Sequence, residues 1–359
     1  MNQSSRAQEK IILDHVIDFF FGLYWDKRKR VIPIPDLSKK HAMLTESAVS
    51  LAQKIKKKEL KSEDLVRALI ERMKEVNPAI NAVAADRYET ALAEAKEVDA
   101  LIAAGLSDEE RQKKPFLESQ AVKGMPLTMG LWSRRKEVAQ EDSAAIIMLK
   151  QAGAIPIASS NLPELLNPHH TGRTPGGSSG AEAALTASYA TPISLLYYMD
   201  SSLDYMPYYH AGFNHMYRLW SYWMSKEPDN YAEIFTNFNG EANCVVEFVK
   251  KIIGQSKHCF FTVLRLIELK VMPLPEPAAP HVAPYHHSCL LRPYNFSYFA
   301  IVNVLKCPAV QVPLGKNSDG LPLGIQVLAA PYKDALCLSV AKYLEKELGG
   351  AVMACKLKD

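Results

Sequence analysis

Residues 172–188 read Gly-Arg-Thr-Pro-Gly-Gly-Ser-Ser-Gly-Ala-Glu-Ala-Ala-Leu-Thr-Ala-Ser, a glycine- and serine-rich stretch that leads into a run of small residues. The alanine-rich part, residues 181–187, favours a helix. The two serines before it, Ser178 and Ser179, are therefore expected on an exposed turn at a helix N-terminus, where a hydroxyl can relay protons or simply cap the helix. Three glycines of the turn can adopt positive φ and bring backbone N–H groups close to a bound group: Gly176, Gly177 and Gly180.

Residues 174–180, hereafter the serine loop, resemble the core of the amidase signature family. Residues 150–157 are similar to the strand that precedes this loop in the family, and residues 322–327 to its C-terminal strand. Within the family, the likeness is greatest to the membrane-associated fatty-acid amide hydrolases. The resemblance implies an α/β fold in which a mixed, twisted β-sheet core is covered by α-helices. Residues 124–128, 154–158 and 308–312 are then expected as strands of one sheet.

The resemblance also implies roles for the serine loop. Ser178 matches the bridging serine, which in the family connects a neutral lysine to a second, nucleophilic serine. The rest of the substrate and oxyanion loop would be Gly176, Gly177, Ser179 and Gly180. In the intact mechanism the lysine accepts a proton from the bridging serine, which accepts one from the nucleophile as it attacks an amide carbonyl. No cofactor is needed.

The catalytic lysine of the family is not found where the resemblance places it. Residues 124–129 are similar to the family's first core strand, but the next position holds Gly130. Lys123 and Lys136 flank this point, in charged or polar surroundings that favour the ammonium form over a neutral base.

The nucleophile turn departs from the family pattern as well. Residues 189–204 contain no glycine. Ser202 falls at the family's spacing from Ser178 and is the candidate nucleophile by spacing only. A serine beside Asp200 and Asp204 is more simply explained as part of a polar turn.

Three functional hypotheses follow. The chain is a hydrolase of fatty-acid amides with rearranged catalytic residues and reduced or absent activity; it is a non-catalytic relative that binds lipid or a partner; or it is an incomplete splice form or gene model. Joins at 129–130, at 167–168 and after residue 187 omit pieces of the family pattern while the flanking sequence still matches, which favours lost coding segments.

Residues 11–25 are rich in apolar and aromatic side chains and predict a helix. Asp14 and Asp18 share one helical face, and a broad apolar face remains opposite. The basic cluster 27–30 follows, so the segment fits either an interfacial membrane anchor or a helix docked on the protein's own core. The run is too short and too often interrupted for a transmembrane helix, and no signal peptide is evident.

The expected organisation is an amphipathic membrane-proximal segment (1–35) followed by an incomplete amidase-like domain (44–349). By resemblance, residues 205–280 form a helical insertion that faces substrate and membrane. Further helices are expected from residue 44, from Ser62 to a stop at Asn77-Pro78, and over 88–104, 143–151 and 333–348.

Composition and charge limit the classes of partner that the chain is expected to bind. The 359 residues are 48% hydrophobic and carry a net charge of +3 with cations and acids interspersed, so nucleic acid is not expected. Six scattered cysteines without C-x-x-C spacing indicate a reducing compartment and no metal site. The expected partners are an acyl amide or another lipid-like small molecule and a membrane surface reached through residues 11–30, with a homodimer left open. The expected location is intracellular and peripheral to a membrane, with the cytoplasm as the alternative.

Overall fold

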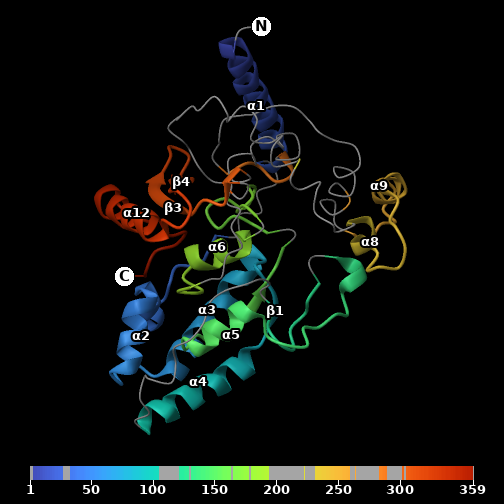
Figure 1. Cartoon of the computed structure of the whole chain (residues 1–359). Helices are drawn as coiled ribbons and strands as arrows, with labels where there is room; N and C mark the ends of the chain where they lie inside the picture. The colour runs from blue at the N-terminus through green and yellow to red at the C-terminus, as the bar shows by residue number, and fades with distance from the viewer. Residues whose placement is uncertain are drawn as a thin grey trace.

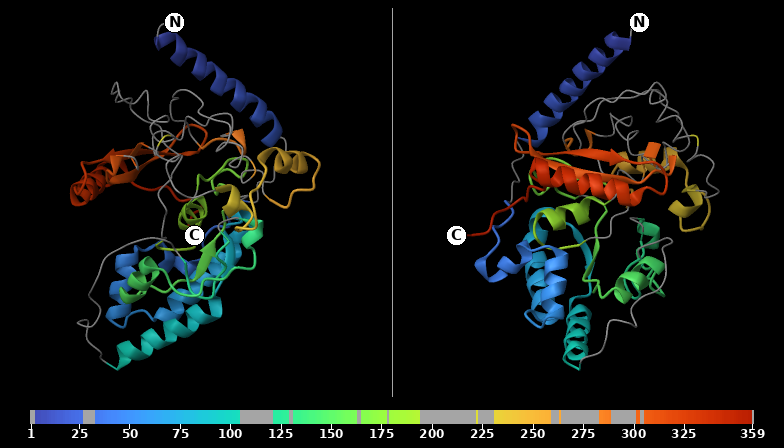
Figure 2. Two further views of the ribbon diagram at one scale, coloured as in Figure 1. Left: turned by 45° about the vertical axis from the view of Figure 1, so that its right-hand side comes forward. Right: turned by 60° about the vertical axis from the view of Figure 1, so that its left-hand side comes forward.

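The computed structural model of the chain is shown in Figures 1 and 2. It describes residues 3–26 (side chains from 13), 33–104, 121–128, 131–162, 165–177, 179–193, 222, 231–258, 263, 283–288, 301–302 and 305–358. Ser178 and Ser202 lie outside these residues. The helices are α1 (Gln3–Trp25), α2 (Ala48–Lys56), α3 (Ser62–Ile80), α4 (Tyr88–Ala103), α5 (Ala144–Gln151), α6 (Gly180–Ala187), α8 (Tyr231–Phe235), α9 (Cys244–Ile252) and α12 (Asp334–Leu348), with short 3-10 helices η1 (Lys39–Thr45) and η3 (Trp132–Arg134).

Helix α3 is the centre of the core because its apolar residues point in three directions. Its first half packs on η1 and α2 through Leu65 and Leu69, and on α4 through Val66 and Ile70. Its second half packs on α6 through residues that include Met73, Val76, Ala79 and Ile80 on one side and Ala181, Ala184 and Leu185 on the other. Leu65, Leu69 and Met73, which recur every four residues in the sequence, are all buried. The packing on α3 is what holds the helix that follows the serine loop.

Both ends of α3 differ from the sequence expectation. Ser62 does not cap the helix; instead, the carboxylate of Asp99 in α4 accepts from the backbone N–H groups of Ser62 and Glu63 at 2.7 and 3.0 Å. The helix also continues past Asn77-Pro78 to Ile80. It ends there because Asn81 adopts a left-handed conformation and the Asn77 side chain accepts from the next two backbone N–H groups.

The described strands form two separate antiparallel pairs rather than one mixed sheet. Strand β1 (Val83–Asp86) pairs with β2 (Ala158–Ser160), and β3 (Ala309–Lys316) pairs with β4 (Pro322–Leu328). The expectation that residues 124–128, 154–158 and 308–312 share one sheet was therefore wrong for the described residues. Residues 124–127 instead bond back to 137–139 across the turn at η3. Arg87 binds the carbonyls of Pro156 and Ile157, so β2 begins only at residue 158.

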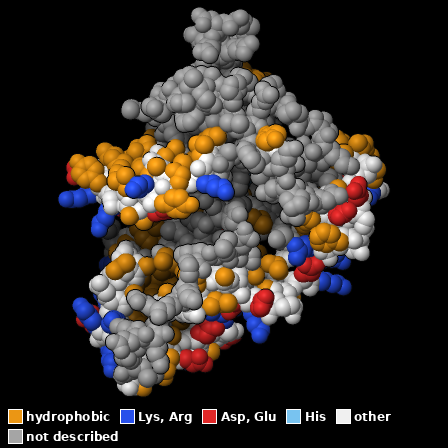
Figure 3. Space-filling model, in the orientation of Figure 1, with side chains coloured by type: hydrophobic (Ala, Val, Ile, Leu, Met, Phe, Trp, Pro, Cys, Tyr) orange, Lys and Arg blue, Asp and Glu red, His pale blue; other side chains and the backbone are white. Residues whose placement is uncertain are grey.

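The C-terminal hairpin β3–β4 carries α12 on one face, with Cys337 and Ala341 on the buried side of the helix. Its turn is closed by Asn317, whose side chain accepts from Asp319 and Leu321 N–H. In all views α6 lies between this unit and α3 (Figures 1 and 2). Figure 3 shows hydrophobic side chains gathered over the same unit, with Lys and Arg at its rim. Exposed members include Tyr332, Leu336, Leu338 and Tyr343.

Helix α1 projects away from the rest of the chain (Figures 1 and 2). The amphipathic helix expected over residues 11–25 is present, but its acidic stripe faces inward: Asp14 and Ile17 are buried, whereas Phe19 and Phe20 are 62% and 63% exposed. No helix in the described part of the chain is both long enough and apolar enough to cross a membrane.

The end of the chain returns to its beginning. Leu37 pairs in parallel with Leu357, and Ala354 N–H donates to Ala187 O at the end of α6. Arg72 of α3, which is fully buried, lies under this contact and donates to Pro35 O, Ser188 O and Cys355 Sγ. One guanidinium therefore joins the N-terminal segment, α3, the end of α6 and the C-terminal tail.

Candidate active site

Two glycines of the serine loop cannot easily be replaced, one because of its backbone conformation and the other because of its packing. Gly176 has φ +102°, a region that residues with a Cβ rarely enter. A Cβ on Gly180 would lie 3.1 Å from Pro175 Cγ and 3.5 Å from Leu165 Cδ1, because this residue begins α6 against the core. A Cβ on Gly177 would meet nothing within 4 Å, so its side of the loop adjoins open space.

Ser179 occupies the N-cap position of α6, half-buried, with φ −91° and ψ 29°. Its side chain makes no capping hydrogen bond to the helix. Ordinary capping therefore does not account for this serine.

The residues just before Gly177 are joined to one another by hydrogen bonds. Asn167 N–H donates to Arg173 O, and the Asn167 side chain donates to Thr174 O at 3.1 Å. Thr174 Oγ1 in turn accepts from Gly176 N–H at 3.2 Å. Residues 167–176 thus form a hydrogen-bonded turn that fixes where the serine loop begins.

Residues 283–288, which are distant in sequence, form hydrogen bonds to this turn. Thr174 N–H donates to Pro284 O at 2.9 Å, and His286 N–H donates to Gly172 O at 3.2 Å. The Arg173 guanidinium lies 4.0 Å from the centre of the Tyr285 ring and donates to Ala283 O. These contacts place residues 283–288 directly against the candidate site.

The C-terminal end of α1 contacts the same segment, residues 283–288. Trp25 Nε1 donates to His286 O at 3.2 Å, and Tyr285 OH donates to the Asp26 carboxylate at 3.2 Å. The close fit is also visible at Gly22, where a Cβ would lie 3.2 Å from Tyr285 OH. The N-terminal helix is therefore attached next to the serine loop, a connection that no local sequence pattern signals.

Burial favours the neutral form of the histidines around this junction. It lowers the pKa of His169 to about 4, with a smaller contribution from Lys316. Burial also lowers the pKa of His170, to which Arg173 adds and which Asp26 opposes, and the pKa of His286. The imidazoles beside the serine loop are thus uncharged at neutral pH.

The two lysines that flank the family's lysine position do not provide a buried base. Lys123 and Lys136 are both exposed. Removal from water is what makes a lysine neutral near pH 7, so neither residue has the environment that the family mechanism requires.

A second polar contact near the loop was not anticipated. Ser160 on β2 donates to Glu182 in the first turn of α6 at 2.5 Å. It fastens the start of α6 to the β1–β2 pair. The acidic residue two positions after Gly180 was the available signal, but in sequence it is indistinguishable from an ordinary first-turn carboxylate.

A model of the amidase family matches residues 64–195 and 248–338, which is more than half of the chain and includes the whole serine loop. The chain belongs to the amidase family. The match is interrupted over residues 196–247, which contain the candidate nucleophile Ser202.

Curated relatives extend the likeness of this amidase to nearly the whole chain. Fatty-acid amide hydrolase 2-B of Danio rerio is 26% identical over 500 aligned residues, covering 92% of this chain and 94% of the relative. Fatty-acid amide hydrolase 2 of Homo sapiens is 25% identical over 528, covering 98% and 99%. A solved structure described as fatty acid amide hydrolase superposes with a TM-score of 0.57 at 14% identity, covering 87% of each chain, which shows a shared fold.

The alignment with the human relative is longer than this chain. The human comparison spans 528 positions, but this amidase has 359 residues, so at least 169 positions (528 less 359) have no counterpart in it. The alignment covers 99% of the human relative, so these unmatched positions lie within the aligned span.

Proposed function

We propose that this chain is a fatty-acid amide hydrolase-like amidase that binds acyl amides at a membrane surface and hydrolyses them at a strongly reduced rate or not at all. The observation that carries the proposal is the combination of a matched serine loop with an unmatched segment 196–247 in a chain whose relatives along its full length are fatty-acid amide hydrolases.

The reduced rate follows from the chemistry. Ser178 retains the bridging position, but a bridge needs a neutral base on one side and a nucleophile on the other. Both candidate lysines are exposed, and Ser202 has neither the glycines nor the neighbours of an oxyanion turn. Members of a catalytic unit are not additive, so loss of one member already costs a factor of about 10⁴ to 10⁶ in rate.

Membrane attachment is proposed through α1. Its exposed face carries Phe19 and Phe20, and the sequence continues at once into four cations, residues 27–30. Aromatic side chains beside a basic cluster suit the interface of an anionic bilayer. We accordingly retain residues 1–35 as a membrane-proximal segment, 44–349 as the amidase domain and 205–280 as its substrate- and membrane-facing insertion. The proposed location is peripheral to an intracellular membrane surface, with the cytoplasm as the alternative.

A fluorophosphonate probe tests the proposal. The purified chain and a complete relative are treated in parallel, and adducts are located by intact mass and peptide mapping. We expect the relative to be labelled and this chain to be labelled at least about 10⁴ times more slowly, while a cooperative unfolding transition confirms that it is folded. Rapid labelling of Ser178, Ser179 or Ser202 would contradict the proposed loss of activity.

The alternative is an incomplete gene product, favoured by the 169 or more unmatched positions. Peptides spanning the joins at 129–130, 167–168 and 187–188 decide between the two. Their detection by mass spectrometry in natural material supports the chain as a real product, whereas detection of longer peptides with intervening sequence identifies an incomplete form.

A further inference from the structure

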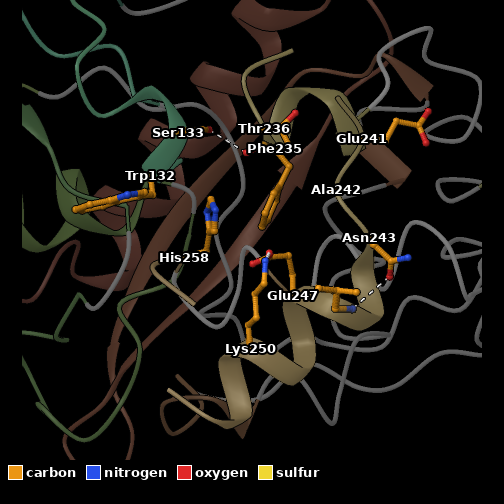
Figure 4. A pocket seen from close by; sticks show the side chains of 11 residues that line it. Trp132, Ser133, Phe235, Thr236, Glu241, Ala242, Asn243, Glu247, Lys250 and His258 are labelled. Atoms are coloured by element: carbon orange, nitrogen blue, oxygen red, sulfur yellow. Dashed lines mark hydrogen bonds and ion pairs between the residues drawn. The ribbon is translucent and has the colours of Figure 1, made fainter. Parts of the chain in front are cut away.

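A cavity of about 320 Å³ opens between η3 and the α8–α9 unit (Figure 4). It is lined by Trp132 and Ser133 on one side and by Phe235, Glu247, Lys250 and His258 on the other. These residues come from segments 131–135 and 231–258, whereas the serine loop is 174–180. Ligand pockets occupy roughly 300 to 1,000 Å³, so this one suits a compact ligand of one or two rings.

The walls are held in place by contacts of their own. Ser133 Oγ donates to Phe235 O at 2.9 Å and so ties η3 to α8. Asn243 caps α9 by accepting from the N–H groups of Val245 and Val246. A preformed cavity loses less entropy when a ligand enters it.

The interior surface is aromatic. The rings of Phe235 and His258 stack with centroids 4.0 Å apart, and Figure 4 shows the His258 ring between those of Trp132 and Phe235. Nδ1 of His258 is buried without a hydrogen-bond partner among the described residues, so packing rather than hydrogen bonding holds this ring. Burial, with Lys251 and Lys250, lowers the pKa of His258 although Glu247 opposes the shift.

The cavity is lined by two carboxylates and one lysine, and further cations lie around it. Arg135 and Lys257 lie 4.7 and 5.8 Å from the centre of the Trp132 ring. Lys250 pairs with Glu247 at 2.6 Å and is still 46% exposed, and Lys251 donates to His258 O. Glu241, which also lines the cavity, and Glu247 are the acids among the charged groups named here. An anionic group at the mouth is therefore favoured over a cationic one.

We propose that this cavity is a binding site for a small planar aromatic carboxylate, separate from the serine loop. The ligand ring packs against Trp132 and against the His258 ring that stacks on Phe235, and its carboxylate lies at Lys250, within the field of Arg135 and Lys257. Aromatic stacking supplies most of the affinity, and the lysine favours an anionic ligand over a cationic one. Because the proposal concerns binding alone, it does not depend on whether the chain hydrolyses amides.

Three probes that share one ring system test the choice of charge: 2-naphthoate, 2-naphthalenemethanol and 2-naphthylmethylamine. Their dissociation constants for the full chain are measured by isothermal titration calorimetry, with competition by saturation-transfer NMR. We expect the carboxylate to bind at least ten times more tightly than the amine, with the alcohol between them.

Variants locate the site. Trp132→Leu and Lys250→Gln change residues that are 43% exposed and 46% exposed (side chain), so the core is spared. We expect at least a ten-fold loss of naphthoate affinity for the first and about a five-fold loss for the second. The matched controls are Tyr343→Leu and Lys346→Gln on α12, which should leave the affinity unchanged.

Several results would overturn the proposal. They are tighter binding of the amine, equal effects of cavity and α12 variants, no binding of naphthoate up to its solubility limit, or stronger competition by a long-chain carboxylate below its micelle concentration. The last result would make the cavity part of an acyl-chain path instead.

Discussion

At the scale of single residues, His169 gives this chain a defined response to acid. Its imidazole lies in the closed loop before the serine loop, where burial and the charge of Lys316 lower its pKa from 6.5 to about 4. The unfolded chain therefore binds a proton between pH 6.5 and pH 4 that the folded chain does not, so folding stability falls as the pH falls through this interval.

We predict that the free energy of unfolding decreases by about 2 kcal/mol between pH 7 and pH 4 because of this one ring, less than its full pKa shift implies, since the ring keeps partial contact with water. Urea unfolding of the wild type and of His169→Gln at both pH values measures the difference. The exposed His15→Gln serves as the control and should keep the wild-type slope. An unchanged slope in His169→Gln would contradict the assignment.

The residues of the serine loop show what sequence alone could supply. Of the three glycines for which the motif suggested positive φ, Gly176 has it, whereas Gly180 is required for a different reason, its contact with Pro175. The roles of Ser178 and Ser202 rest on resemblance and stay predictions. The Ser160–Glu182 contact could not be predicted because its partners belong to separate elements and are joined only by the fold.

At the scale of elements, the orientation of α1 decides how the chain meets a membrane. The acidic residue Asp14 faces inward together with Ile17, and the aromatic residues Phe19 and Phe20 face outward. A helix that only covered its own core would have the opposite arrangement.

We predict that Phe19→Ser/Phe20→Ser reduces binding to vesicles containing anionic lipid by about ten-fold or more, because two aromatic side chains no longer enter the interface. Flotation at low and high salt measures it, and raised salt should weaken the wild type as well. Val49→Ser on α2, where the valine is equally exposed, is the control. If wild type and double variant float alike, α1 is not the anchor.

Helix positions were predictable wherever the signal is local. Helices near residues 88–104, 143–151 and 333–348 were expected, and α4, α5 and α12 occupy these ranges. The ends of α3 were not predictable, because the N-terminal cap is supplied by Asp99 from another helix and Asn77 closes the C-terminal end across a proline. The single sheet was expected from the family resemblance, but pairing depends on partners that this chain does not supply in the described residues.

At the scale of the whole molecule, Arg72 connects parts of the chain that are far apart in sequence. Its guanidinium binds Pro35 O, Ser188 O and Cys355 Sγ and pairs with Glu75 at 2.6 Å. The buried carbonyl of Ser188 and the half-buried carbonyl of Pro35 therefore depend on one side chain.

We predict that Arg72→Met lowers the free energy of unfolding by about 2 to 4 kcal/mol, because these carbonyls lose their donor inside the core. The control lies on the same helix: Arg67 forms an exposed pair with Glu63, and Arg67→Met should cost less than about 0.5 kcal/mol. Thermal and urea unfolding compare the two variants. Equal losses would show that Arg72 does not hold the tail and the core together.

The position of Arg72 also has a consequence for biosynthesis. The ribosome adds Ser188 116 residues after Arg72, and Cys355 283 residues after it. At about 5 to 20 residues per second, the second interval lasts roughly 15 to 60 s. Throughout this period the nascent α3 carries a cation that has Pro35 O and Glu75 available but lacks Cys355, so its surroundings must stay hydrated or be sheltered by a chaperone. The surroundings of Arg72 therefore reach their final packing only after Cys355 has been added.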